Sequence, residues 1–380
     1  MSVPQFHFIV IGAGPAGSSA AWGLARDGWR VAILERAAFP RVKVCGEFIS
    51  PAATELLEAI VPAAELIQAG AKRVDEFVLQ AARRQRVWKM PRPAWAFSRA
   101  SLDLLLLEKA TQAGAVVRQS EGVQSVAYAD DAVALTLRGG ATMRTACVIH
   151  ADGAGRHDPS GATPLAPDMM GYKCHLRVPP GTGDEIALGL KVRGVTMRAC
   201  PGAYVGMIAV ENGLVTCALT VTKKVASQHK GDGDAMLTAL WPQYDPAWRS
   251  TPWLACGVAR SGYIRPGHGR SLRIGNAAAA VDPIGGEGIG LALWAGTRLV
   301  ECLRRTLEDG NRNALQIENI IRAERAFASE YATRLRWRRP ACRLAAEVFI
   351  RPALVRALWP LLGWPRMSIA PWYKMTGKPT

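Results

Sequence analysis

The chain of 380 residues lacks the patterns that identify several classes of protein. Its eight cysteines form no C-x-x-C pair and its six histidines form no H-x-x-x-H or H-E-x-x-H pattern, so neither a zinc site nor a disulfide framework is expected. No G-x-S-x-G occurs, which disfavours a serine nucleophile. No signal-type region opens the chain, and no run of about 18 uncharged apolar residues is present. These absences predict a cytoplasmic protein with no spanning helix and no metal site.

Acidic residues are scarce relative to basic ones. The chain has 31 Asp and Glu against 47 Lys and Arg, for a net charge of +16. A hydrophobic share of 49% excludes a disordered basic protein. Residues 331–380 hold ten cations and one acid, so more than half of the excess charge lies in this segment. Nucleic acid is not expected as a partner, because no supporting motif accompanies the charge.

The opening segment has the features of a dinucleotide-binding βαβ unit in the correct order. An apolar run at Phe6–Ile11 leads into G-x-G-x-x-G at Gly12, Gly14 and Gly17, and an alanine-rich helical pattern then leads to a second strand at Val31–Leu34. The first glycine permits a tight turn, the second lets the backbone approach a pyrophosphate, and the third allows the helix to pack closely on the strand. The helix N-terminus then offers free N–H groups to phosphates.

Glu35 ends the second strand, 18 residues after Gly17. This is close to the offset of about 20 residues expected for a carboxylate that binds the ribose of an adenosine. An acid here disfavours a 2′-phosphate, so FAD or NAD is predicted rather than NADP.

Two later segments resemble further parts of such a site. A strand pattern at Cys147–Ala151 is followed by Asp152-Gly153, and a strand at Leu272–Ile274 leads through a Pro-Gly-Gly loop into a helix expected to begin near Gly288. A helix entered from such a loop can stabilise the charged N1/O2 edge of a reduced flavin. A helix entry with flexible glycines and no ligand is the alternative.

Together these segments resemble the superfamily of group A FAD-dependent monooxygenases and geranylgeranyl reductase-like flavoproteins. The resemblance spans roughly residues 5 to 300 and includes PRVKVCGEFISP at 40–51, FSRASLDLLLLEKATQAGA at 97–115, HADGAGR at 150–156 and GNAAAAVDPIGGEGIGLAL at 275–293. It implies an α/β fold with a Rossmann-like FAD-binding domain of the para-hydroxybenzoate hydroxylase type, an inserted β-sheet substrate domain and a C-terminal helical segment. The expected boundaries are 1–72, 98–170 and 263–306 for the FAD-binding domain, 73–97 and 171–262 for the substrate domain, and 307–380 for the basic helical segment.

The resemblance also assigns candidate site residues. FAD is the implied cofactor, and its expected binding residues are Gly12, Gly14, Pro15, Ala16, Gly17, Glu35, Arg36, Arg41, Cys45, Gly46, Arg99, Asp152, Gly275, Asn276, Asp282, Pro283, Gly286, Gly288 and Ile289. Cys45 and Tyr204 are the catalytic candidates. Cys45 is expected beside the isoalloxazine ring, with a packed loop thiol as the alternative.

Departures from the family pattern guide the functional expectation. Asn276 replaces the usual aspartate, whose contact to the ribityl chain an amide can still make. The halogenase motif W-x-W-x-I-P is missing, and the run at 202–213 keeps Tyr204 of the reductase pattern Y-x-W-x-F-P without its tryptophan or Phe-Pro. Halogenation is therefore disfavoured, and the chain looks more like the hydroxylases of polyketide and alkylphenol pathways.

The expected activity is hydroxylation of an apolar aromatic or polyketide-like small molecule through a flavin C4a-hydroperoxide, with dioxygen as co-substrate. Only one βαβ nucleotide unit is present, so NAD(P)H is expected to dock transiently unless a partner protein supplies the electrons. Two alternatives remain open: an alkene reductase acting on a prenyl or other lipid chain, and an FAD electron-transfer protein at a membrane surface.

Alternating apolar and polar residues at 73–90 and 171–221 predict a β-sheet with hairpins. Turn signals occur at 179–181 and at Asn212-Gly213. Tyr204, Trp88 and Phe97 are expected either to face the substrate or to pack in the core.

The C-terminal segment is expected to be helical at 297–307, 317–336 and 341–362, with breaks at Pro352 and Pro360. It mixes arginines with tryptophans, a composition that suits peripheral contact with anionic lipid. A helical pair that packs on the substrate domain, with its arginines reaching to water, is the alternative.

Overall fold

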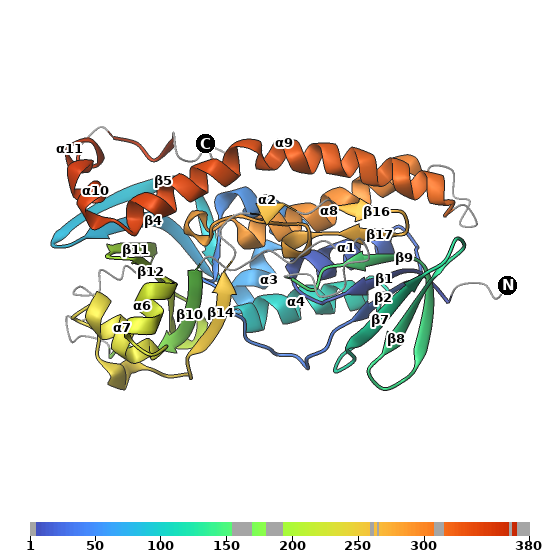
Figure 1. Cartoon of the computed structure of the whole chain (residues 1–380), viewed down its shortest axis with the longest axis horizontal. Helices are drawn as coiled ribbons and strands as arrows, with labels where there is room; N and C mark the ends of the chain where they lie inside the picture. Colours follow the sequence, from blue (N-terminus) through green and yellow to red (C-terminus); the bar gives the residue numbers. More distant parts are fainter. Residues whose placement is uncertain are drawn as a thin grey trace.

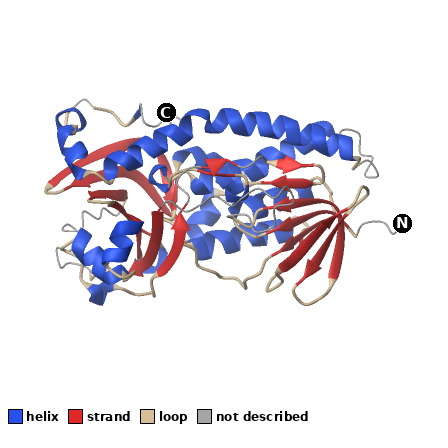
Figure 2. Cartoon of the chain, in the orientation of Figure 1, coloured by secondary structure: helices blue, strands red, loops and turns tan. Residues whose placement is uncertain are grey.

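Two eight-stranded β-sheets lie at opposite ends of the molecule, with helices between them and along one side (Figures 1 and 2). The structure is a computed structural model that describes residues 5–153, 169–179, 193–258, 262–263, 266–307, 315–364 and 367–370. This α/β architecture confirms the predicted fold class, whereas the domain boundaries given above remain a prediction.

The first sheet is built around β1 (Phe6–Ile11), which is parallel to a strand on each side. Phe8 and Val10 pack in the cluster that holds the helices, whereas Ile9 and Ile11 pack toward the β7–β8 hairpin, so β1 is buried on both faces. This explains why its sequence is continuously apolar. The other strands are β2 (Val31–Leu34), β6 (Val116–Arg118), β7 (Val123–Tyr128), β8 (Val133–Leu137), β9 (Thr142–His150), β16 (Gly267–His268) and β17 (Ser271–Arg273).

Three helices cover one face of this sheet: α1 (Pro15–Arg26), α4 (Arg99–Gln112) and α8 (Gly288–Thr306). The α1–α8 contact is very close, because a Cβ added at Gly296 would lie 2.1 Å from Ser19 Oγ. Small residues in both helices therefore allow the two nucleotide-motif helices to pack side by side. The helix predicted near Gly288 begins at that residue.

The second sheet contains the segments predicted to be β-structure. In sheet order its strands are β14 (Leu254–Val258), β10 (Met169–Leu176), β13 (Val215–Thr222), β12 (Ala203–Ala209), β11 (Gly194–Cys200), β4 (Lys72–Ala81), β5 (Arg84–Ala96) and β3 (Phe48–Ile49). The predicted turn at Asn212-Gly213 is confirmed between β12 and β13, where both residues have positive φ angles of 58° and 68°. The other predicted turn falls partly outside the described residues, at 180–181.

Shorter elements complete the fold. Helices α6 (Lys223–Gln228) and α7 (Gly233–Leu240) pack their apolar side chains on one face of the second sheet. Helices α2 (Pro51–Glu58) and α3 (Ala63–Gln68) precede β4, and the strands β15 (Gly262–Tyr263) and β18 (Ala279–Ala280) form a small pair.

The C-terminal helices run along one side of the molecule, from the first sheet to the second (Figure 1). They are α9 (Ile317–Phe349), α10 (Pro352–Ala357) and α11 (Trp359–Leu362). The predicted break between residues 336 and 341 is wrong, because α9 continues through Pro340. Arg338, Cys342 and Ala346 keep one buried face on both sides of the proline, and this packing offsets the lost backbone hydrogen bond. Among the described residues, no helix has the length and apolarity needed to cross a membrane.

Candidate functional site

A cavity of about 880 Å³ is lined by residues from both sheets. One part of its wall comes from the loops that follow β1 and precede α8, and from the segment 41–48. The other part comes from the second sheet and from α9 to α11. The cavity therefore joins the predicted nucleotide motifs to the predicted substrate sheet.

The glycine loop after β1 has the geometry that its sequence predicts. Gly12 has a φ of +101°, and a Cβ there would lie 2.6 Å from Ala151 O. A Cβ at Gly17 would lie 1.9 Å from Gly12 O, so this glycine permits the close packing of α1. Gly14 differs, because a Cβ there would meet only two guanidinium nitrogens at 3.7 Å. It faces an open, positively charged part of the cavity at the uncapped N-terminus of α1.

Glu35 holds the loop as well as facing the cavity. Its carboxylate accepts hydrogen bonds from Ala13 N at 3.0 Å and from Ala37 N at 3.1 Å. Arg41 lies 3.4 Å from the same carboxylate. The Nε atom of Arg41 is buried without a hydrogen-bond partner in the described part of the chain, so this guanidinium has a donor available for an anion.

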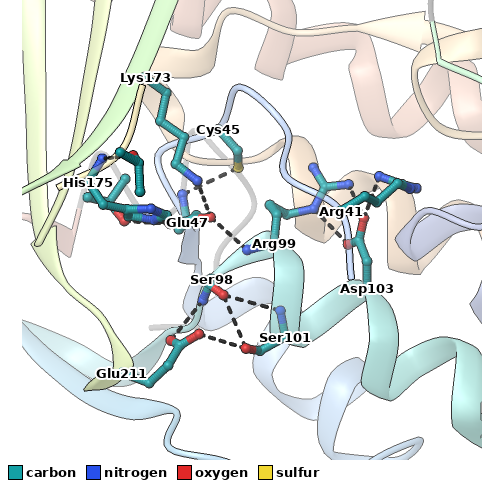
Figure 3. Close-up of polar contacts among 12 residues, drawn as sticks. Arg41, Cys45, Glu47, Ser98, Arg99, Ser101, Asp103, Lys173, His175 and Glu211 are labelled. Carbon is teal, nitrogen blue, oxygen red and sulfur yellow. Dashed lines mark hydrogen bonds and ion pairs between the residues drawn. The ribbon is translucent and has the colours of Figure 1, made fainter. Parts of the chain in front are cut away.

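Asp103 binds both guanidinium groups that lie near Gly14, those of Arg99 and Arg41. Arg99 Nε and Nη2 each donate to it at 2.7 Å, and Arg41 Nη1 lies 3.0 Å from it (Figure 3). Burial opposes the charge on Arg99, but Asp103 outweighs that effect and raises the pKa of the guanidinium. Asp103 was not among the site residues predicted from the sequence, although its position four residues after Arg99 on a predicted helix is typical of an ion pair between the two side chains.

The loop before α8 lines the cavity with residues 283–286. Gly286 adopts a left-handed φ of +62°, and α8 starts without a side-chain cap on its free N–H groups. Asp282 lies behind this loop and does not line the cavity: its Oδ1 accepts from Tyr204 Oη at 2.8 Å and from Ile284 N at 3.1 Å. Tyr204 thus connects the second sheet to this loop, and its own ring lines the cavity.

Glu47 is the centre of a buried polar cluster beside Cys45 (Figure 3). Its φ of +56° is unusual for a residue with a side chain, and its N–H donates to Cys45 Sγ at 3.3 Å. Its carboxylate is fully buried, contacts the Lys173 ammonium, lies 2.9 Å from His175 Nε2 and accepts from Arg99 N at 2.7 Å.

The environment of Glu47 favours its charged form. Burial would raise the pKa of this carboxyl, but the hydrogen bond from His175, the charge and hydrogen bond of Lys173, and the Thr216 hydroxyl lower it to about 2. The cluster joins the Cys45 loop and the start of α4 to β10 and β13 of the second sheet. The sequence contained one signal of it, because Lys173 and His175 lie two residues apart on one face of a largely apolar strand.

A second buried carboxylate makes a similar link. Glu211 Oε2 accepts from Ser98 N at 3.1 Å and Glu211 Oε1 accepts from Ser101 Oγ at 2.8 Å, so the turn after β12 stabilises the N-terminus of α4. Ser98 itself caps this helix by accepting from Ser101 N. Both contacts place Arg99, the first residue of α4, at the edge of the cavity.

The part of the cavity farther from the nucleotide motifs is apolar. Trp88 and Met90 of β5, Met197 of β11, Val348 of α9 and Val355 of α10 contribute to its wall. Trp88 is a candidate that the structure places at the cavity, whereas Phe97 is fully buried in the core.

Every predicted cofactor-binding residue except Gly17 and Asp282 lines the cavity, as do the catalytic candidates Cys45 and Tyr204. Asp152 Oδ1 is a further buried atom without a hydrogen-bond partner among the described residues, at the end of β9. No group of three His, Cys, Asp or Glu that could hold a metal occurs in the described ranges.

Comparisons with known proteins agree with this geometry. Residues 5–157 match the family model described as an FAD binding domain. Menaquinone reductase of Mycolicibacterium smegmatis is 30% identical over 324 residues, covering 78% of this chain and 75% of that protein. Kynurenine 3-monooxygenase of Xanthomonas oryzae pv. oryzae is 28% identical over 321 residues, covering 74% of this chain and 68% of that protein. The crystal structure of the halogenase PltM in complex with phloroglucinol and FAD aligns with a TM-score of 0.70 at 20% identity, covering 87% of this chain and 75% of that one.

Proposed function

Since this chain belongs to the family of FAD-dependent oxidoreductases that includes menaquinone reductase and kynurenine 3-monooxygenase, we propose that it is a flavin monooxygenase that hydroxylates an apolar aromatic small molecule. The observation that carries this proposal is the continuity of one cavity from the nucleotide motifs to an apolar wall on the second sheet. Such a wall can hold an aromatic ring next to the cofactor and keep water away from it.

The residues that line the nucleotide end fit FAD. The diphosphate would lie over Gly14, at the N-terminus of α1, where the Arg41 and Arg99 guanidinium groups converge. Arg41 Nε is buried without a hydrogen-bond partner among the described residues, and it would donate to a phosphate oxygen. Glu35 would bind the adenosine ribose, and the buried Asp152 Oδ1 would accept from a hydroxyl of the cofactor.

The ring end of the cofactor would meet the two remaining motifs. When bound, FAD accepts hydride from a nicotinamide nucleotide and, once reduced, supplies the electrons that transfer one oxygen atom from dioxygen to the substrate. The N-terminus of α8 and the segment Gly286–Ile289 would stabilise the negative edge of the reduced ring. Cys45 and Gly46, in the loop that Glu47 holds, also line the cavity and would contact the ring.

The substrate would lie against the apolar wall. Trp88, Met90 and Met197 offer aromatic and thioether surface to a flat ring, and Val348 and Phe349 would contact an apolar substituent. The halogenase PltM binds phloroglucinol, an aromatic ring, in a chain of the same fold. We therefore place an electron-rich phenolic ring with an apolar substituent first among substrates, with NAD(P)H as a transient reductant.

A reductase of a lipid-like substrate is the second candidate. Its support is the 30% identity to menaquinone reductase over three quarters of that protein. In that case the substrate would occupy the same apolar wall, and a protonated group such as the Cys45 thiol would deliver a proton opposite the hydride.

One experiment separates the two. FAD-loaded protein is reduced with NADH or NADPH in the absence of oxygen, mixed with an alkyl-substituted polyphenol, and exposed to isotopically labelled dioxygen. A product that gains one labelled oxygen atom supports the monooxygenase. A saturated product that forms without oxygen, from the polyphenol or from a menaquinone tested in parallel, would overturn it in favour of the reductase.

A variant of the apolar wall tests the substrate site itself. Val348→Asn puts a polar amide into the wall, so water should enter and a larger share of the electrons from NAD(P)H should end as free hydrogen peroxide. Val116→Asn, at an exposed valine of β6, is the matched control. Equal coupling in the two variants would contradict the assignment of this wall.

A further inference from the structure

The C-terminal helices carry most of the large apolar side chains that are exposed in the described part of the chain. Trp337 and Leu344 of α9 are each 68% exposed, and Leu361 of α11 and Trp364 after it are 57% and 59% exposed. Leu354 of α10 and Leu358, which directly follows α10, add to the same set. We call these six side chains the apolar patch. Because α10 contacts both α9 and α11, these exposed apolar side chains gather on neighbouring helices, and such a grouping marks a contact surface.

Cations accompany the apolar patch. Arg336 and Arg356 are exposed on the same helices and Arg343 is half-buried, and Arg336 and Arg343 directly precede Trp337 and Leu344. Since the two arginines are seven residues apart, as are the two apolar residues, they form parallel rows on one side of α9. Glu347 is the one acid between residues 331 and 380, and its carboxylate lies 2.6 Å from Arg351 and 3.5 Å from Arg343, so it balances only one of the cations in this segment.

The cavity reaches this surface. Leu344 and Leu358 belong to the apolar patch and also line the cavity, together with Leu362 of α11. Leu344 and Leu358 thus belong both to the wall of the cavity and to the exposed surface, and both are apolar. An apolar molecule could pass between the cavity and whatever covers the apolar patch.

We propose that this surface lies on an anionic lipid bilayer, with the cavity opening toward the lipid. Interleaved arginines, tryptophans and leucines suit the headgroup region, where the cations meet phosphates and the apolar side chains enter the acyl boundary. A second copy of the chain is a poorer occupant, because two such surfaces would bring their arginines together. The inference goes beyond the proposed reaction and does not depend on it, since lipid contact can be measured without turnover.

The test is co-sedimentation of the full-length, FAD-loaded protein with vesicles. Phosphatidylcholine vesicles that contain phosphatidylglycerol should bind the protein, vesicles of phosphatidylcholine alone should bind it at least about tenfold more weakly, and added NaCl should release it. No difference between the two vesicle types would overturn the proposal.

Two pairs of variants locate the contact. Arg336→Glu with Arg343→Glu should lower the partition coefficient by at least about tenfold, since each cation near such a surface contributes about fivefold. Lys223→Glu with Lys224→Glu makes the same change of net charge on exposed residues of α6, on the far side of the second sheet, and should have a smaller effect. Equal losses in the two variants would mean that net charge alone attracts the protein and would overturn the proposal.

The apolar contribution is tested in the same way. Trp337→Ser with Leu361→Ser should weaken binding, whereas Ile67→Ser with Val116→Ser, at exposed positions of α3 and β6, should not. None of these four residues lines the cavity, so FAD content and turnover on a water-soluble substrate should be unchanged. Light scattering that shows a dimer dissociated by the Trp337 and Leu361 substitutions would instead assign the surface to a second copy.

Discussion

Glu47→Gln is a conservative substitution for which the structure predicts a large loss of stability. It keeps the shape of the side chain but removes the charge that the Lys173 ammonium and His175 face. Lys173 is 1% exposed, so the variant leaves a buried cation without its carboxylate. Breaking a buried pair in this way costs about 3–5 kcal/mol. The pKa of Glu47 gives a similar magnitude, because a decrease from 4.5 to about 2 corresponds to about 3 kcal/mol of stability at neutral pH.

The sign of the pH dependence follows from the same shift. The folded-state pKa of Glu47 lies below the unfolded one, so its contribution is fully present above pH 4.5 and is lost as the pH falls toward 2. Wild-type protein should therefore lose stability over this window more steeply than Glu47→Gln, in which this carboxylate is absent.

Urea unfolding followed by tryptophan fluorescence measures both effects. Glu55→Gln is the matched control, because the Glu55 side chain is 78% exposed and its pair with Arg92 should contribute less than about 1 kcal/mol. Adding Lys173→Met to Glu47→Gln should recover part of the loss, since no buried charge then lacks a partner. A urea midpoint for Glu47→Gln equal to that of Glu55→Gln would refute the reasoning. So would a double variant whose loss of unfolding free energy exceeds the sum of the losses in the two single variants.

Three further predictions follow from the cavity wall. Gly14→Val should abolish FAD binding but leave the fold intact, because a Cβ there meets nothing closer than 3.7 Å, whereas Gly17→Val should prevent folding, since its Cβ would lie 1.9 Å from a backbone oxygen. Circular dichroism and flavin absorbance distinguish the two variants, and yellow Gly14→Val protein would mean that the glycine loop does not bind the cofactor. Arg41→Met should weaken FAD binding by roughly tenfold or more through loss of charge-assisted hydrogen bonds, as measured by flavin fluorescence titration, and unchanged affinity would contradict its placement at the diphosphate. Tyr204→Phe removes the hydroxyl that donates to buried Asp282 and should cost roughly 1–3 kcal/mol in urea unfolding, so an unchanged midpoint would argue against that hydrogen bond.

The nucleotide-binding end of the site was largely predictable because its signals are local. The glycines, the apolar β1 and the acid at position 35 act through backbone geometry within about thirty residues, so their spacing alone predicts a strand, a turn and a helix. The start of α8 at Gly288 followed from its glycine loop in the same way. The path of α9 through Pro340 did not, since the gain that offsets the proline comes from packing against distant residues.

The sequence by itself predicted a dinucleotide-binding βαβ unit and determined that more than half of the excess charge lies in residues 331–380. Only the tertiary structure decided that Glu47, Lys173 and His175 meet, because the fold brings together segments more than 120 residues apart. It likewise placed Tyr204 on Asp282, and it placed Leu344 of α9 at the wall of the cavity. Local conformational preferences act over a few residues, whereas the burial of a charge depends on every segment that packs around it.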